Sequence, residues 1–447
     1  MKVIADLHLH SKYSRAVSQQ MIPQVMAEWA VKKGINLLGT SDWTHALWLK
    51  ELEASFNESS NGVYSLKNSK NNLSKVKFIL ATEISSIYSQ GGKTRRIHNV
   101  VFIPSFKIAY KINKELKSRG CNLMSDGRPI IGLSSIELAE LIWSIDKNCI
   151  IVPAHIWTPW FSMFGSKSGF DSVSECWGKY EKHIYAIETG LSSDPTMNWL
   201  VKDLDTRSIL SFSDAHSPAK LGRETTVFEL EELSFENLRK ALKARLKPGK
   251  NKILYTTEFY PEEGKYHYTG HRKCSVKHTF ADTLKKGTTC PVCGKPLTLG
   301  VMHRVSELAK NKSIEPIKKE NKAGLIGYYN PEDKTRPPYV MLVPLMEIIA
   351  ESFSIGVGSK KVANEYENII KNLGTEIDVL TQTKIEKIAK HSGDKIAQGI
   401  DKVRKGDIVV DPGFDGVFGV VKIWHSQNST SDEKQDLLKS KEQMSFF

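Results

Sequence analysis

Short apolar runs recur through the first half of the chain, and each ends in a polar or charged residue. They cover residues 3–10, 37–42, 78–83, 150–155, 186–188 and 210–216, and their length is that of buried strands. The segments between them have helical patterns, and in one of them Ser134 and Glu137 form the Ser-x-x-Glu signature of a capped helix start. From residue 1 to about 227 we therefore predict strands alternating with helices, as in a βα-barrel.

Nearly every one of these predicted strands ends in a residue type that can bind a metal ion. Because the carboxyl ends of parallel strands share one rim of a barrel, we expect these side chains to meet in space. The opening His-x-His is a natural start for such a site, since residues two apart in a strand point the same way. The candidates are His8 and His10, Asp42 with His45, Glu83, His155, Glu188, and Asp214 with His216.

A second kind of metal site follows this first part of the chain. The spacing of Leu238, Ala241, Leu242 and Leu246 predicts an amphipathic helix over residues 234–246, and the basic stretch around residues 248–249 predicts a linker. Beyond the linker, a His-x-x-Cys motif is followed by Cys-x-x-Cys at zinc-ribbon spacing. We predict a structural Zn²⁺ bound by His271, Cys274, Cys290 and Cys293. His278 or His303 could replace His271 as the fourth ligand.

The C-terminal part is expected to be rich in helices. Val362, Tyr366 and Ile369 set the register of one helix, and residues 406–410 and 417–423 predict a β-hairpin around a loop of turn residues. The chain becomes polar after Trp424. We therefore divide it into a barrel (1–248), a zinc-binding module (255–308), a helix-rich domain with a terminal hairpin (309–424) and a disordered tail (425–447).

The composition of the chain predicts a polyanionic partner. The 447 residues carry a formal net charge of +13. Lysine and arginine neutralise phosphates, and two of the basic runs flank the predicted zinc module, so we expect contact with nucleic acid. No segment approaches the ~20 apolar residues of a membrane helix. The first strand does not look like a signal peptide, which predicts a cytoplasmic protein.

The order of the candidate ligands resembles that of the polymerase and histidinol phosphatase (PHP) superfamily of metal-dependent phosphoesterases. Within it, the chain is similar to the endonuclease Q family up to about Trp424. The residues that carry this likeness are 39–45, 213–218, 221–224 and the zinc segment from 266–268 through 301–305. The resemblance implies a distorted (β/α)7-type PHP barrel, then a small zinc-ribbon module and a helix-rich C-terminal region.

The resemblance also implies a reaction and a set of residues. The reaction is hydrolysis of the DNA phosphodiester 5′ to deaminated bases (hypoxanthine, uracil, xanthine) and abasic sites. Asp42 would be a further ligand or an orienting carboxylate, and with Arg223 and Glu188 it completes our catalytic candidates. Arg223 would hold a phosphate or pair with a carboxylate such as Glu224. The implied metal ligands are His8, His10, His45, Glu83, His98, His155, Asp214 and His216.

Two departures from the superfamily pattern are informative: the first bears on the number of metal ions, and the second favours the endonuclease Q subgroup. Arg15 follows Ser14 where the superfamily often has Asp or His, and Trp43 follows Asp42 where it commonly has His. Arginine does not bind cations, so we expect about two divalent ions and not three. Mixed imidazole and carboxylate ligands favour Zn²⁺, Mn²⁺ or Fe²⁺.

Recognition of a damaged base requires further residues. The loop after His155 is rich in aromatics, and we name Trp157, Trp160 and Phe161 as candidates for contact with a flipped base, the alternative being that they pin the loop. The C-terminal Gln443, Phe446 and Phe447 are similar to peptides that bind a sliding clamp. Two other functions remain: a PHP phosphatase for a small phosphate monoester, and a DNA-binding adaptor without activity.

Overall fold

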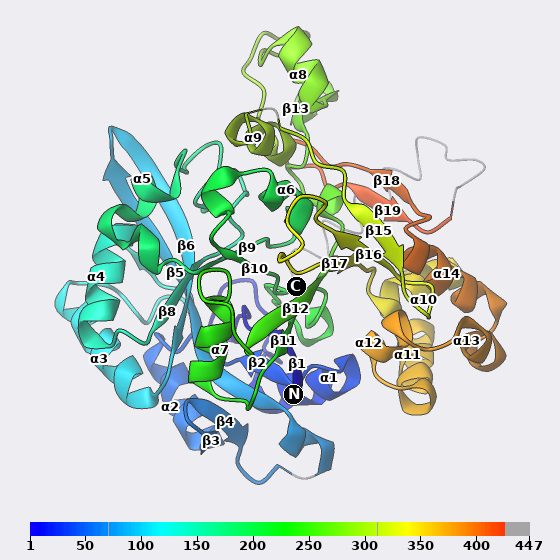
Figure 1. Ribbon diagram of the computed structural model, residues 1–447, viewed down its shortest axis with the longest axis horizontal. Coiled ribbons are helices and arrows are strands. Elements are labelled where there is room, and N and C mark those ends of the chain that lie inside the picture. Colours follow the sequence, from blue (N-terminus) through cyan, green and yellow to red (C-terminus); the bar gives the residue numbers. More distant parts are fainter. Residues whose placement is uncertain (70, 311, 425–447) are drawn as a thin grey trace.

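A large mixed sheet forms the centre of the protein in the computed structural model, which describes residues 1–69, 71–310 and 312–424 (Figure 1). Its described part has thirteen strands. The main path runs through β15 (Ile317–Glu320), β16 (Ile326–Tyr329), β17 (Tyr339–Met341), β12 (Lys252–Glu258), β11 (Thr225–Glu229), β1 (Lys2–Asp6), β2 (Leu37–Gly39), β5 (Lys77–Gln90), β4 (Val63–Leu66) and β3 (Phe56–Ser60). From β5 the sheet continues to β6 (Lys93–Ile103) and β8 (Ile150–Pro153), and β7 (Ile130–Ile131) also pairs with β5.

The strands are not all parallel, contrary to the simple alternation that the sequence pattern predicts. β1, β2 and β5 are parallel, but β6 runs antiparallel to both β5 and β8. The reason is a tight turn between β5 and β6, where Gly91 and Gly92 adopt φ values of 61° and 71°. Such left-handed residues match the twist of a hairpin and leave no room for a crossover helix.

The strands follow one another around an apolar interior. β9 (Ala186–Glu188) contacts β8 and pairs in parallel with β10 (Ser208–Leu210). After β10 the chain returns to the end of β1, where Leu9 bridges Ala215. Alternate side chains of these strands, including Val3, Ala81 and Val100, form one buried cluster. This arrangement brings the ends of β1, β8, β9 and β10 together.

Helices cover the outside of these strands. They are α1 (Pro23–Lys33), α2 (Ala46–Ser55), α3 (Phe106–Ser118), α4 (Ser135–Ile145), α5 (Val173–Trp177), α6 (Pro195–Trp199) and α7 (Phe235–Leu242). The predicted capping box of Ser134 and Glu137 is confirmed at the start of α4. The predicted helix over residues 234–246 is α7, which ends earlier, at Leu242. None of the helices in the described ranges is long and apolar enough to cross a membrane.

The rest of the chain forms a projecting module and a helical region (Figure 1). The module contains β13 (Thr269–His271), β14 (Val276–His278), α8 (Phe280–Lys286) and α9 (Val301–Leu308). After it, β15, β16 and β17 rejoin the central sheet, so the region predicted to be helix-rich begins with strands. Its helices are α10 (Leu345–Phe353), α11 (Lys360–Leu373), α12 (Glu376–Thr381), α13 (Ile385–Ser392) and α14 (Asp394–Lys405).

Two predictions for the C-terminal part can be compared with these elements. Val362, Tyr366 and Ile369 are the buried residues of α11, as their spacing predicts. The predicted hairpin is confirmed by β18 (Val409–Asp411) pairing antiparallel with β19 (Val420–Lys422). The tail at 425–447, with Gln443, Phe446 and Phe447, lies outside the described residues.

Candidate metal centre

Imidazole and carboxylate groups from residues far apart in the sequence meet at one mouth of the strand arrangement. They form three overlapping groups, and within each group the ligand atoms lie within 4.8 Å of one another. Glu83 and His10 each belong to two groups, which links all three. We call the whole set the ligand cluster, and it contains His8, His10, Glu83, His98, His155, Asp214 and His216.

His8 has the geometry of a metal ligand held by a carboxylate. Its Nδ1 donates to Glu188, whose two carboxylate oxygens lie 2.9 and 3.0 Å away. This bond fixes the tautomer, so that Nε2 carries the lone pair. Nε2 is buried without a hydrogen-bond partner, 3.6 Å from Glu83 Oε1 and 3.7 Å from Asp214 Oδ1. A buried acceptor next to two carboxylate oxygens fits a cation.

Glu83 joins this group to a second pair of histidines. Its Oε1 lies 2.6 Å from His98 Nδ1 and 3.1 Å from His155 Nε2. His98 lies in the middle of β6, and since this strand is antiparallel to β5, the residue still faces the mouth, where Ser85 is its neighbour in β5. The antiparallel strand therefore explains how a residue that does not end a strand joins the cluster.

Asp42 contacts His10 from behind. His10 Nε2 lies 2.9 Å from Asp214 Oδ1, and its Nδ1 lies 3.6 Å from Asp42 Oδ1. The other Asp42 oxygen accepts hydrogen bonds from the Ser11 amide and hydroxyl and from the Ser14 hydroxyl. Asp42 is thus in the position of a carboxylate that orients His10, and the Ser14 hydroxyl anchors Asp42.

Two predicted site residues have other partners. His45 lies outside the ligand groups: its Nδ1 accepts a hydrogen bond from the Trp48 amide at the start of α2, and its ring stacks on Tyr13 at 4.3 Å. Arg223 donates from Nε to the Ser213 carbonyl at 2.9 Å, which ties it to the strand end before Asp214. The structure therefore gives His45 a capping contact and Arg223 a backbone contact.

Arg128 is a residue of this mouth that sequence reasoning missed. Its Nη1 donates to Glu83 Oε2 at 3.0 Å, and 28% of its side chain is exposed. No apolar run precedes it and no motif marks it, because the loop after α3 brings it back to β5. Of its side-chain donors, only Nη1 has a described partner, so the guanidinium can also bind an anion at the mouth.

The electrostatics of the cluster favour positive charge at its centre. Burial opposes ionisation of Glu83, but His98 and Arg128 hold its pKa well below the usual range. Burial likewise opposes the charged form of His10, yet Asp214 and Asp42 raise its pKa to about 9. Ionised carboxylates that stabilise nearby cations are what a metal site requires.

Backbone strain collects at the same place. Asp42, His155 and Asp214 have φ values of 43°, 30° and 48°, in the left-handed region that non-glycine residues rarely adopt. Such residues persist only where the surrounding structure fixes them, and they concentrate at functional sites.

The aromatic loop after His155 divides into buried and accessible residues. Trp157 has no exposed surface, and its Nε1 donates to Asn198 Oδ1 at 2.9 Å, so it pins the loop as the alternative interpretation proposed. Trp160 is half-buried and packs against Tyr266 of the projecting module at 5.4 Å. Phe161 lies 4.8 Å from His98, at the edge of the ligand cluster. Trp160 and Phe161 are therefore the ones placed to contact a ligand.

The projecting module contains the second group of metal-binding side chains. His271, Cys274, Cys290 and Cys293 offer ligand atoms within 4.8 Å of one another, and we call them the cysteine cluster. Burial opposes ionisation of the Cys290 thiol, but the amides of Cys293 and Val292 lower its pKa to about 6, which favours the thiolate that zinc binds. Of the alternative ligands, His303 lies 3.2 Å from Glu307 and neither it nor His278 belongs to the group.

Comparisons with known sequences place the chain among proteins of archaea and bacteria. A family model described as the MJ0043 C-terminal domain matches residues 344–407. The uncharacterized protein MJ0043 of Methanocaldococcus jannaschii is 34% identical over 288 residues, which are 62% of this chain and 33% of that protein. The chain thus spans about a third of that relative's length. The uncharacterized protein YqxK of Bacillus subtilis is 29% identical over 94% of this chain and 99% of YqxK.

Comparisons with solved structures extend over the whole chain. The lesion-specific endonuclease PfuEndoQ from Pyrococcus furiosus is 32% identical, with a TM-score of 0.79, covering 98% of this chain and 99% of that one. Endonuclease Q in complex with a 27-mer duplex substrate, which has an abasic lesion at the active site, is 33% identical with a TM-score of 0.80. That match covers 97% of this chain and 100% of the other.

Proposed function

The chain belongs to the endonuclease Q family, and we propose that it is a metal-dependent DNA repair endonuclease. Its substrates would be duplexes that contain hypoxanthine, uracil, xanthine or an abasic site, cut at the phosphodiester 5′ to the lesion. The observation that carries the proposal is the ligand cluster, in which seven side chains form three linked groups and the buried Nε2 of His8 has no hydrogen-bond partner. The full-length likeness to nucleases of this family supports the same reaction.

The finer architecture is part of this proposal. We assign residues 1–248 to a distorted (β/α)7-type PHP barrel, with the antiparallel β6 as its distortion. Residues 255–308 would be the zinc-binding module, with Zn²⁺ held by the cysteine cluster. Residues 309–424 would form the C-terminal domain, whose first strands extend the central sheet.

The ligand cluster would hold about two divalent ions, Zn²⁺, Mn²⁺ or Fe²⁺, because its donors are both nitrogen and oxygen. Such ions, when bound, activate water and stabilise charge during displacement at phosphorus. We leave His45 out of the ligand set because it caps α2. No side chain of the cluster needs to act as a nucleophile.

The chain's own residues would position this chemistry. Glu188 holds His8 through a hydrogen bond, and Asp42 lies 3.6 Å from His10 Nδ1, so that each imidazole presents Nε2 to the cluster. Arg128 would contact an oxygen of the scissile phosphate, because its guanidinium lies beside Glu83 of the ligand cluster. The sequence pattern gave this role to Arg223, whose Nε donates to the Ser213 carbonyl. Trp160 and Phe161 would flank an extruded base beside the cluster.

A nicking assay tests this function. Duplexes with a single uracil, hypoxanthine or abasic site are incubated with the protein and Mn²⁺ or Zn²⁺, with an undamaged duplex and histidinol phosphate in parallel. We expect a nick 5′ to the lesion and no cut in the undamaged duplex. Release of phosphate from histidinol phosphate without nicking would favour the phosphatase, and binding of DNA with no turnover would favour the adaptor.

A further inference from the structure

A groove on the outer face of the central sheet lies between the first strand and the C-terminal helices. Its volume is about 350 Å³, within the range of sites that bind small molecules. It is lined by Lys2 and Tyr255 from β1 and β12, by Lys319, Gly327, Tyr329 and Val340 from β15 to β17, and by Thr381 and Gln382 at the end of α12, among others. We call it the tyrosine groove.

The sheet register explains why these side chains share one face. Lys319 is opposite Gly327, and Gly327 is opposite Val340, so the three residues form a row across the strands. Tyr329 is two positions from Gly327 in β16 and therefore points to the same side. A Cβ at Gly327 would lie 3.1 Å from the Tyr329 ring, so the glycine lets this ring lie close against the sheet.

Each wall of the groove has a lysine over a tyrosine ring. Lys2 Nζ lies 5.2 Å from the centre of the Tyr255 ring, and Lys319 Nζ lies 4.8 Å from that of Tyr329. Neither ammonium group has an ion pair in the part of the chain that the structure describes. The neighbouring Lys252, by contrast, is paired with Glu229 at 3.0 Å. One carboxylate, Glu320, also lines the groove, so the two ammonium groups leave it with net positive charge. Positive charge beside two tyrosine rings suits a ligand that has both phosphates and bases.

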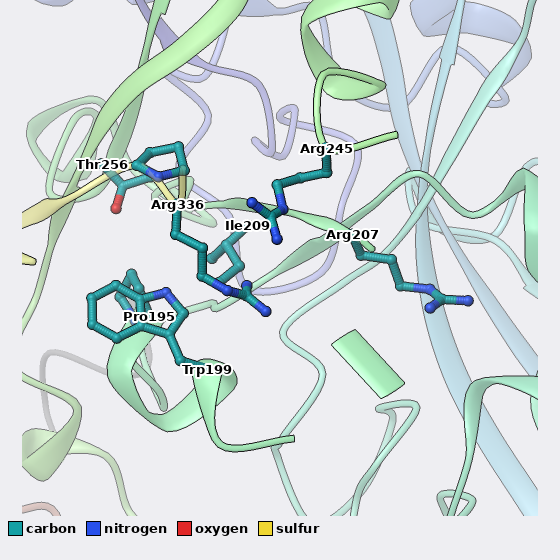
Figure 2. A pocket seen from close by; sticks show the side chains of 8 residues that line it. Pro195, Trp199, Arg207, Ile209, Arg245, Thr256 and Arg336 are labelled. Atoms are coloured by element: carbon teal, nitrogen blue, oxygen red, sulfur yellow. The ribbon is translucent and has the colours of Figure 1, made fainter. Parts of the chain in front are cut away.

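Lysines also lie over aromatic rings elsewhere, as Lys243 does over Tyr185, but the tyrosine groove brings two such pairs to one hollow. The basic side chains of a second pocket differ. Arg245 and Arg336 line a small pocket beside Trp199, from which Arg207 points away (Figure 2). Arg245 lies 2.8 Å from Asp333, and Arg336 lies 2.9 Å from Asp205. Their charges are satisfied within the fold, so this pocket has no evident use for an anion.

We propose that the tyrosine groove binds a single strand of DNA, with bases stacked on Tyr255 and Tyr329 and phosphates contacted by Lys2 and Lys319. Aromatic faces accept any base, and lysines follow the backbone, which is how sequence-independent binding of single strands works. The groove is distinct from the ligand cluster, because Lys2 begins β1 while His8 lies beyond its other end. The identification of DNA as the ligand of this groove rests on the proposed function.

Charge reversal at two neighbouring lysines tests the groove. Lys319→Glu removes a charge that faces it, and Lys318→Glu is a matched control, because Lys318 is one position away on the opposite face of β15, over Tyr328 at 5.7 Å. Affinity for a fluorescein-labelled oligothymidine strand without a lesion is measured by anisotropy at one fixed salt concentration. We expect about tenfold weaker binding for Lys319→Glu and less than about twofold for Lys318→Glu.

A second variant addresses the stacking face. Tyr255→Ala should weaken binding of the strand several-fold without changing the net charge, and thermal unfolding of each variant checks that it is folded. Equal losses of strand affinity in Lys318→Glu and Lys319→Glu would overturn the proposal that the tyrosine groove binds a single strand. Unchanged affinity in both Lys319→Glu and Tyr255→Ala would overturn it as well. Incision by the wild-type protein is measured separately: failure to nick damaged DNA overturns the proposed function alone, whatever the strand affinities show.

Discussion

The ligand cluster and the cysteine cluster both bring histidine together with charged ligands, but they are built in opposite ways. The first draws residues from positions 8 to 216 to a buried mouth, whereas the second takes all four from positions 271 to 293 of a projecting module. The first has Glu188 and Asp42 behind its imidazoles, and the second has three thiols and one imidazole. The ligand cluster can form only after the strands that carry its residues have folded together. The cysteine cluster can bind its ion and fold its own short segment locally.

This contrast predicts different consequences of losing a ligand. Strands that fold around a large apolar interior keep their arrangement without the ions, so a change in the ligand cluster affects the reaction. A small module with few buried apolar residues depends on its ion for folding. The following predictions test this difference.

The largest effect is expected from His8→Ala. Loss of the imidazole that faces Glu83 and Asp214 should reduce incision by about a thousandfold or more, since metal ions contribute several kcal/mol to such reactions. DNA affinity and thermal unfolding should change little. Asp214→Ala should behave in the same way, and exposed His183→Ala is the control. Unfolding of His8→Ala would contradict the idea that the barrel folds without this site.

Cys290→Ser should act on the module instead. Loss of one thiolate should release zinc, expose residues 269–300 to proteolysis and weaken DNA binding. Zinc content and protease mapping measure this effect, with Cys121→Ser as the control because Cys121 lies outside the cluster. A module that stays protease-resistant without zinc would contradict the claim that it depends on its ion for folding.

Glu188→Gln tests the carboxylate behind His8. The amide can still accept from Nδ1, but it no longer balances the charge of the imidazole, so metal affinity should fall about 10- to 100-fold. Incision should recover at high metal concentration, which His8→Ala cannot do. A loss of incision that no metal concentration restores would assign Glu188 a role in contact with the substrate.

Arg128→Ala tests contact with the phosphate. Removal of a charged hydrogen-bond donor should lower kcat/KM by at least about tenfold. The metal content should remain unchanged, because arginine is not a ligand. Arg128→Lys should restore part of the loss, and the exposed Arg119→Ala serves as the control. Lower metal content in Arg128→Ala would mean that the residue only positions Glu83.

The smallest effect concerns a carboxyl of the central sheet, at the end of β12, that has hydroxyl partners in place of imidazoles. Burial raises the pKa of Glu258 to about 8, and the Ser211 hydroxyl donates to it at 2.5 Å. Because the pKa of Glu258 is higher in the folded than in the unfolded protein, its protonated form is fully compatible with folding below the unfolded-state pKa, and stability is lost as the pH rises toward 8. Glu258→Gln should therefore gain stability relative to wild type between pH 5 and 8, on the order of 1 kcal/mol. A difference in Tm that does not vary with pH would contradict this.

Much of the ligand cluster is predictable from sequence because its residues follow apolar strands. His8, His10, His155, Asp214 and His216 all come at or just after a strand end, where parallel strands gather their side chains. His98 needed the family resemblance, since it lies in the middle of β6 and does not follow the end of an apolar run. The hairpin at Gly91 and Gly92 is the one local signal that β6 runs antiparallel to β5.

Residues positioned by loops were harder to predict. Arg128 reaches the cluster from a loop without periodicity, and only the tertiary structure places it beside Glu83. His45 follows Asp42 closely and looks like a ligand, but the same position is the start of α2, where its ring caps the helix. For Trp157, the sequence could not distinguish stacking on a base from burial against Asn198.

The most direct test of the account is a crystal of the protein with Mn²⁺ or Zn²⁺, examined by anomalous scattering at the metal edges. We expect peaks between His8, Glu83 and Asp214 and between Glu83, His98 and His155, together with a zinc peak at the cysteine cluster. Anomalous density at the cysteine cluster alone, with none at the barrel mouth, would contradict the claim that these distant side chains assemble a metal centre.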